Sequence, residues 1–202
     1  LALMADIRNF VTCHALASVR VYAKPVAHGK HTTTRRQPRP EGLDKMRSLI
    51  ERRYEHWKLV LDDSAMNALA QASGGDLRHF MQRLVSGVVG KALFALDRLP
   101  LSADDAIVQQ VIDENRGETE RLTVKSEWPL LADIADTHNA IATDRQDALR
   151  TLARLFDTRV ILNYRNGAEW FDIHPLLWPL INNYRSSLHA NPTATIPAAP
   201  AT

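Results

Sequence analysis

The chain has few features that would commit it to a membrane, to the exterior of the cell or to nucleic acid. Its 202 residues contain one cysteine, Cys13, so an internal disulfide framework is excluded and a reducing cytoplasm is favoured. No apolar run approaches the roughly 20 residues that a membrane span requires. The net charge of +2 is too small to indicate a nucleic-acid binder by itself. With 45% hydrophobic residues, the composition is typical of a soluble globular protein rather than a disordered or membrane protein.

Complete catalytic and metal-binding motifs are also missing. The stretch Gly87-Val-Val-Gly-Lys-Ala92 is too short for a P-loop, and Ala92 stands where Ser or Thr would bind Mg²⁺. The eight histidines show no metal-ligand spacing, and no Gly-x-Ser-x-Gly motif occurs. We therefore expect no metal site and no catalysis by this chain alone. Because it begins at Leu1 rather than Met, we also expect it to be part of a longer protein.

The first forty residues are predicted to contain a remnant of another domain and a basic linker. A short helix is expected around Ala5–Cys13 and a strand over Val19–Ala23. Residues 25–40 hold three prolines and a glycine, which favours a solvated loop. Lys/Arg outnumber Asp/Glu by nine to four over residues 30–58, so contacts with phosphate are an alternative for this segment.

Residues 41–125 show the 3.6-residue periodicity of a helical bundle. Helices are predicted from Glu41, over Ser64–Ala72, from Asp76 to Leu96 or Asp97, and from a capping box at Ser102–Asp105 to about Gly117. Gly87 and Gly90 lie inside the third of these helices. Each costs about 1 kcal/mol relative to Ala, which suggests close contact with a neighbouring helix.

The junction between the second and third helices, Ser73-Gly-Gly-Asp-Leu-Arg78, is the most informative motif. Gly74 and Gly75 allow a sharp turn, and Asp76 can cap the free N–H groups of the next helix. Arg78 then falls on the first helical turn, a layout common at sites that sense phosphate. An ordinary helix–helix junction is the alternative interpretation.

The last third of the chain predicts two helices followed by a hairpin. The helices are expected over Trp128–Ala142 and Asp144–Phe156, and the strands on either side of Asn166-Gly167. Another helix starts at Pro175. This order describes a winged helix over residues 126–184, followed by a disordered tail over 185–202. The predicted fold is therefore mostly α, with a helical lid-type bundle and a winged-helix domain that contains one β-hairpin.

Five arginines of the winged helix could contact a nucleic-acid backbone, although solvated charges are the alternative. They are Arg145, Arg150 and Arg154 on its second helix and Arg159 and Arg165 beside the hairpin. The hairpin aromatics Tyr164, Trp170 and Phe171 are expected to pack onto the helices rather than to stack on bases.

The combined order of the 73–78 motif, the bundle and the segment Tyr164-Arg-Asn-Gly-Ala-Glu-Trp-Phe-Asp-Ile-His-Pro175 resembles the C-terminal part of AAA+ ATPases. The resemblance covers about residues 19–182 and is nearest to the origin-recognition and replication-initiator branch. It implies that Arg78 is the lid arginine that contacts the γ-phosphate of ATP, with Gly74, Gly75 and Asp76 supporting it. Because proteins of this family often form rings, the resemblance also makes an oligomer possible.

This sequence lacks the family's P-loop, its Mg²⁺-binding acid and its first sensor. ATP and Mg²⁺ are therefore expected only with a core domain supplied upstream or by a partner. In that case the lid and winged helix would couple nucleotide state to DNA or to another protein. Two alternatives are a free-standing winged-helix regulator that binds DNA without nucleotide, and a structural module that docks protein.

Overall fold

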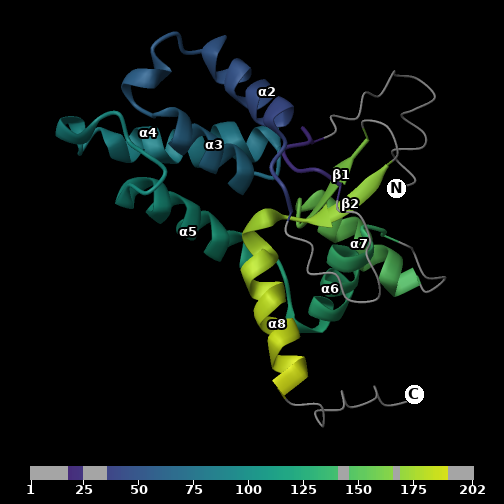
Figure 1. The fold of residues 1–202 in the computed structure, drawn as a ribbon. Coiled ribbons are helices and arrows are strands. Elements are labelled where there is room, and N and C mark those ends of the chain that lie inside the picture. Colours follow the sequence, from purple (N-terminus) through teal and green to yellow (C-terminus); the bar gives the residue numbers. More distant parts are fainter. Residues whose placement is uncertain (1–17, 25–35, 141–145, 166–168, 191–202) are drawn as a thin grey trace.

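The computed structural model describes residues 18–24, 36–140, 146–165 and 169–190 (Figure 1). Within these residues the protein is mostly α-helical and has one small antiparallel sheet of two strands, so the predicted fold class is confirmed at that level. Several predicted features lie outside the described residues. They are the helix around Ala5–Cys13, most of the 25–40 loop, the Asn166-Gly167 turn and residues 191–202 of the tail.

The first unit, which we call the bundle, covers residues 40–122. Its α-helices are α2 (Pro40–Glu51), α3 (Asp63–Ala72), α4 (Ser86–Ala92) and α5 (Ala106–Glu120). A π-helical stretch, η2 (His79–Val85), leads directly into α4, and the short turns are η1 (Trp57–Leu59) and η3 (Leu96–Arg98). The apolar faces of these helices meet in one cluster that includes Met46, Ile50, Met66, Leu69, Phe80, Leu84, Val88 and Val111.

Three predicted helix boundaries in the bundle are wrong. The capping box at Ser102–Asp105 does not form, because Asp105 is itself the N-cap of α5 and accepts a hydrogen bond from the Ile107 amide at 2.8 Å. The helix also continues past Gly117 to Glu120. The helix after Asp76 ends at Ala92 rather than near Leu96. At that end, hydrogen bonds from the Phe94 and Ala95 amides to the carbonyls three residues earlier tighten the last turn.

The two glycines inside that helix differ in their surroundings. A Cβ at Gly87 would lie 3.0 Å from a methyl carbon of Val111, which confirms close contact between the helices there. A Cβ at Gly90 would meet nothing within 4 Å, so the same prediction is wrong for Gly90.

The second unit, which we call the hairpin unit, covers residues 125–190. Its elements are η4 (Lys125–Glu127), α6 (Trp128–Thr137), α7 (Gln146–Asp157), β1 (Ile161–Tyr164), β2 (Trp170–Ile173), η5 (Pro175–Leu177) and α8 (Trp178–Ala190). Ile161 pairs with Ile173, and Tyr164 with Trp170, so the predicted hairpin is confirmed. Helix α6 ends earlier than predicted because His138 takes a left-handed conformation, φ 55°. Helix α8 continues to Ala190, past the predicted start of the tail at residue 185.

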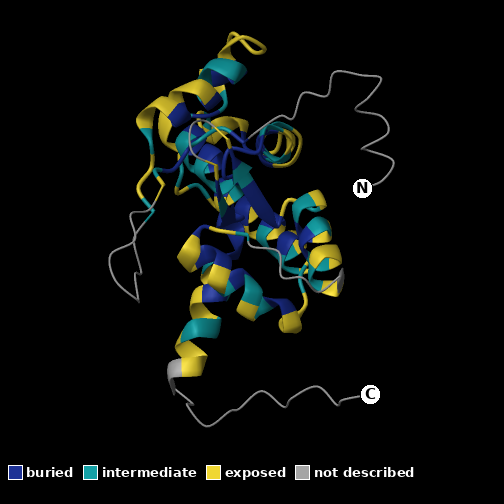
Figure 2. Ribbon diagram, turned by 90° about the vertical axis from the view of Figure 1, so that its right-hand side faces the viewer, coloured by how far each residue is buried: buried dark blue, intermediate teal, exposed yellow. Residues whose placement is uncertain are grey.

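An extended segment, residues 18–24, runs between the two units. The Val19 amide donates to the Gly75 carbonyl at 2.9 Å. The Ala23 amide donates to the Gln37 carbonyl, and the Arg39 amide donates to the Val21 carbonyl. Only Tyr22 forms a bridge, with Pro38, so the predicted strand over 19–23 is an extended segment rather than part of a sheet. Figure 2 shows buried residues gathered at the centre of the molecule, where the units meet.

Candidate functional site

Gly74 and Gly75 lie where the bundle, the hairpin unit and the extended segment 18–24, which we call the incoming segment, meet. Both adopt positive φ, 60° and 82°. A Cβ at Gly75 would lie 1.8 Å from the Val19 carbonyl oxygen, and one at Gly74 would lie 2.4 Å from the Leu162 side chain. The buried Tyr164 hydroxyl donates to the Gly74 carbonyl at 2.8 Å. Glycine is therefore required here both for the turn and for close approach by two other segments.

Asp76 caps the helix that follows, as predicted. Its Oδ1 accepts from the His79 amide at 3.0 Å, the third residue of that helix. Its Oδ2 lies 3.5 Å from Nε of Arg159, a residue of the loop before β1. The carboxylate is buried, so the same group starts the helix and binds a cation of the hairpin unit.

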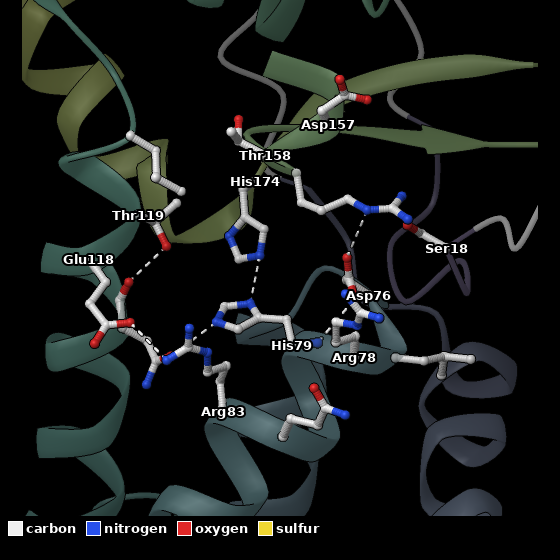
Figure 3. Close-up of a pocket in the computed structure, with 15 residues that line it drawn as sticks. Ser18, Asp76, Arg78, His79, Arg83, Glu118, Thr119, Asp157, Thr158 and His174 are labelled. Carbon is white, nitrogen blue, oxygen red and sulfur yellow. Dashed lines mark hydrogen bonds and ion pairs between the residues drawn. The ribbon is translucent and has the colours of Figure 1, made fainter. Parts of the chain in front are cut away.

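A pocket of about 610 Å³ opens beside this junction. Residues from both units line it, together with Ser18 of the incoming segment (Figure 3). Three guanidinium groups reach it, and two already have partners: Arg159 has Asp76, and Arg83 has Glu118 at 3.5 Å. Arg78 is exposed and makes no hydrogen bond or ion pair with any described residue. It is the cation of this pocket whose donors remain available for a ligand.

Two imidazoles form the back of the pocket. His79 Nδ1 lies 2.9 Å from His174 Nε2, and His79 Nε2 lies 3.1 Å from Asn115 Oδ1. Burial lowers the pKa of His79 and holds the pKa of His174 well below its usual range, with the neighbouring His79 adding to the latter shift. Both rings are therefore neutral at pH 7, and this contact between the units was not predicted from the sequence.

The predicted nucleic-acid arginines are dispersed in the structure. Arg159 lines the pocket, and Arg154 donates to the Leu122 carbonyl and pairs with Glu127. Arg150 and Arg165 are exposed and pair weakly with acids close in sequence. The fifth, Arg145, lies outside the described residues.

The hairpin aromatics serve the core, as predicted. Tyr164 and Trp170 are buried and stack at 4.3 Å between ring centroids. Phe171 is half-buried and packs edge-on against Phe156 at 5.4 Å. These rings are therefore occupied in packing and are not presented to bases.

A second contact between segments was missed entirely. Arg36, which the sequence placed in the solvated loop, makes two bonds to the buried Asp172 carboxylate, at 2.5 and 2.7 Å. Its guanidinium also lies 4.5 Å from the ring centroid of Trp178 and donates to the Ala135 carbonyl. Asp172 was the residue of the sequence that could have indicated this contact. Side chains alternate between the two faces of a strand, so Asp172 lies on the same inward face of β2 as Trp170, and a carboxylate buried there requires a partner.

No group of metal-ligating side chains occurs among the described residues. In that same part of the chain, no helix combines the length and apolar character needed to cross a membrane. Comparison with protein-family models, curated proteins and solved structures found no match to this chain.

Proposed function

We propose that this chain is the C-terminal regulatory part of an AAA+ ATPase, in which Arg78 senses a phosphate of ATP held by a core domain. The observation that carries the proposal is the exposed Arg78 in a pocket where the other two guanidinium groups already face carboxylates. A guanidinium can bind two phosphate oxygens at once, which makes it sensitive to the presence of the terminal phosphate. The chain alone performs no catalysis in this proposal.

The position of the incoming segment supports this interpretation. Ser18 lines the pocket, and its neighbour Val19 is bonded to Gly75, three residues before Arg78. A core domain upstream would therefore connect, through residues 1–17, to a point of the chain that lies beside the pocket. ATP and Mg²⁺ would be bound by that domain, and a closing movement of the bundle, acting as the lid, would bring Arg78 to the nucleotide.

For the hairpin unit, we propose a winged helix that docks another protein. Its order of two helices and a hairpin, α6, α7 and β1–β2, supports the winged-helix interpretation. Arg154 and Arg159 make internal contacts, so they are not available to a DNA backbone without breaking those contacts. This observation favours a protein partner over duplex DNA.

The sensor role is tested by ATP turnover. The chain should be expressed with its upstream core and compared with the Arg78→Ala variant and with Arg53→Ala, an exposed arginine outside the pocket. A charge-assisted contact of about 1.5–3 kcal/mol predicts a loss of about 10- to 100-fold for Arg78→Ala. Equal turnover by wild type and Arg78→Ala would refute the sensor role.

The choice between a protein and a DNA partner is tested with the 202-residue chain alone. Anisotropy of labelled duplex DNA should show no binding at low salt that depends on Arg150 or Arg165. A steep loss of affinity with added salt, reduced by Arg150→Ala, would instead support a free-standing DNA-binding regulator.

A further inference from the structure

A chain of hydrogen bonds joins the bundle to the hairpin unit behind the pocket, and Figure 3 shows its central contact, between His79 and His174. Asn115 on α5 donates from Nδ2 to the Val111 carbonyl at 2.8 Å and faces His79 with its Oδ1. His79 contacts His174, whose Nδ1 in turn accepts from the Leu176 amide at 3.3 Å. The chain therefore runs from a helix of the bundle to the first turn of η5.

The two ends of this chain fix every proton within it. The Val111 carbonyl can only accept and the Leu176 amide can only donate. Asn115 must therefore present its oxygen to His79, which requires a proton on His79 Nε2 and leaves Nδ1 as an acceptor. His174 must then carry its proton on Nε2 and accept at Nδ1. All four bonds are satisfied only when both imidazoles are neutral in the Nε2–H form.

An additional proton would find no free acceptor among these four hydrogen bonds. A proton on His79 Nδ1 would face the N–H of His174. If His174 changed its tautomer to accept this proton, its Nδ1–H would face the Leu176 amide instead. A proton on His174 Nδ1 would cause the same conflict directly. Protonation of either ring therefore removes a bond between the units or the bond that holds the start of η5.

The charges around the pair come from every element packed against it. Asp76, Arg78 and Arg83 belong to the motif and its helix, and Glu118 to α5. Asp157 and Arg159 lie at the end of α7 and in the loop before β1. Asp76 and Glu118 favour the protonated form of His79, whereas Arg83 opposes it, and burial lowers the pKa of both rings.

We propose that the Asn115–His79–His174–Leu176 chain is a proton-sensitive latch, closed while both imidazoles are neutral and opened when either takes up a proton. The latch goes beyond the proposed function, because it requires neither nucleotide nor a core domain. Its opening loosens the contact between the bundle and η5 at the wall of the pocket.

The histidine protons can be observed directly in the protein as it stands. Long-range ¹H–¹⁵N NMR at pH 8 should show His79 and His174 as neutral Nε2–H tautomers. Exposed His56, which lies outside the pocket, serves as the comparison ring in the same spectra. An Nδ1–H tautomer for His79 or His174, or titration of both near 6.5, would overturn the proposal. This result does not depend on whether Arg78 senses phosphate.

Opening is measured by hydrogen exchange of the Leu176 amide, corrected for its intrinsic rate at each pH. Because an open imidazole titrates near 6.5 and a closed one lower, lowering the pH to 5.5 should increase opening about tenfold for one imidazole. The amide of Leu69, a fully buried residue inside α3, reports global unfolding for comparison.

Two substitutions separate the latch from a local effect. His174→Asn can still accept from Leu176 with its Oδ1 but is too short to reach His79, so Leu176 exchange should lose its pH dependence. His56→Gln should retain the wild-type response. If corrected Leu176 exchange in wild type does not increase as the pH falls, is no faster than that of Leu69 at pH 5.5, or keeps the wild-type pH dependence in His174→Asn, the latch does not exist. Should His174→Asn fail to fold, the wild-type tautomers and exchange still decide the matter.

Discussion

Replacing Gly75 by Ala tests whether the glycine pair is a junction of three segments rather than an ordinary turn. The new Cβ would stand 1.8 Å from the Val19 carbonyl oxygen and 2.8 Å from its carbon. These are backbone atoms, so they cannot move aside as a flexible side chain would. The incoming segment must therefore shift away from the junction.

The magnitude follows from three terms. A non-glycine residue at φ 82° costs about 1–2 kcal/mol. Loss of the bond from the Val19 amide to the Gly75 carbonyl adds about 1 kcal/mol. Against these, alanine restricts the unfolded chain and recovers about 0.5–1 kcal/mol. We therefore expect Gly75→Ala to lower the free energy of unfolding by about 2 kcal/mol.

The assay is urea denaturation followed by circular dichroism, with Gly90→Ala as the matched control. Gly90 lies in α4 with open space around its Cβ position, so the same substitution there should stabilise the protein by about 0.5–1 kcal/mol. The two variants should differ by about 3 kcal/mol in opposite directions from wild type. Equal effects would refute the close approach of the incoming segment.

Three further predictions concern contacts away from the glycines. Arg36→Met should cost about 3 kcal/mol in urea denaturation by leaving Asp172 buried without its cation, and adding Asp172→Asn should restore part of that loss; strictly additive effects would contradict the buried pair. Asp105→Ala should cost about 1 kcal/mol as a lost helix cap, whereas Asp105→Asn should cost much less, and equal losses would argue against capping. Folding lowers the pKa of three histidines, His79, His138 and His174. Below pH 6.5 the unfolded chain therefore binds more protons than the folded one. The free energy of unfolding should thus be highest above pH 6.5 and fall by about 1.4 kcal/mol per pH unit for each imidazole below it. A free energy of unfolding that stays constant between pH 7.5 and 5.5 would contradict neutral buried rings.

The helices and the hairpin could be predicted because their signals are local. The apolar stripe after Glu41 and the two β-rich runs around 159–174 each lie within one element. Helix ends were less predictable, as α4 shows. Leu93, Phe94 and Leu96 continue the apolar pattern beyond Ala92, yet they are exposed at 67%, 91% and 66%. Periodicity records which residues are apolar but not whether a neighbouring element is there to cover them.

The candidate site could be predicted only in its local half. The glycines, the cap and Arg78 lie within five consecutive positions, so the turn, the cap and the place of Arg78 on the first helical turn follow from the rules of turns and helix starts. The pairs Arg36–Asp172 and His79–His174 join residues 136 and 95 positions apart. No local pattern relates such residues, because only the packing of the two units brings them together.

The contrast within the motif supports the proposal that Arg78 binds a ligand. Gly74 contacts the hairpin, Gly75 bonds the incoming segment, Asp76 pairs with an arginine before β1, and His79 bonds the imidazole before η5. Each of these residues has a partner far away in the sequence that the fold itself requires. Arg78 sits among them, exposed in the pocket, with no partner among the described residues. In the proposed function, an anion that enters the pocket would be the partner of this guanidinium.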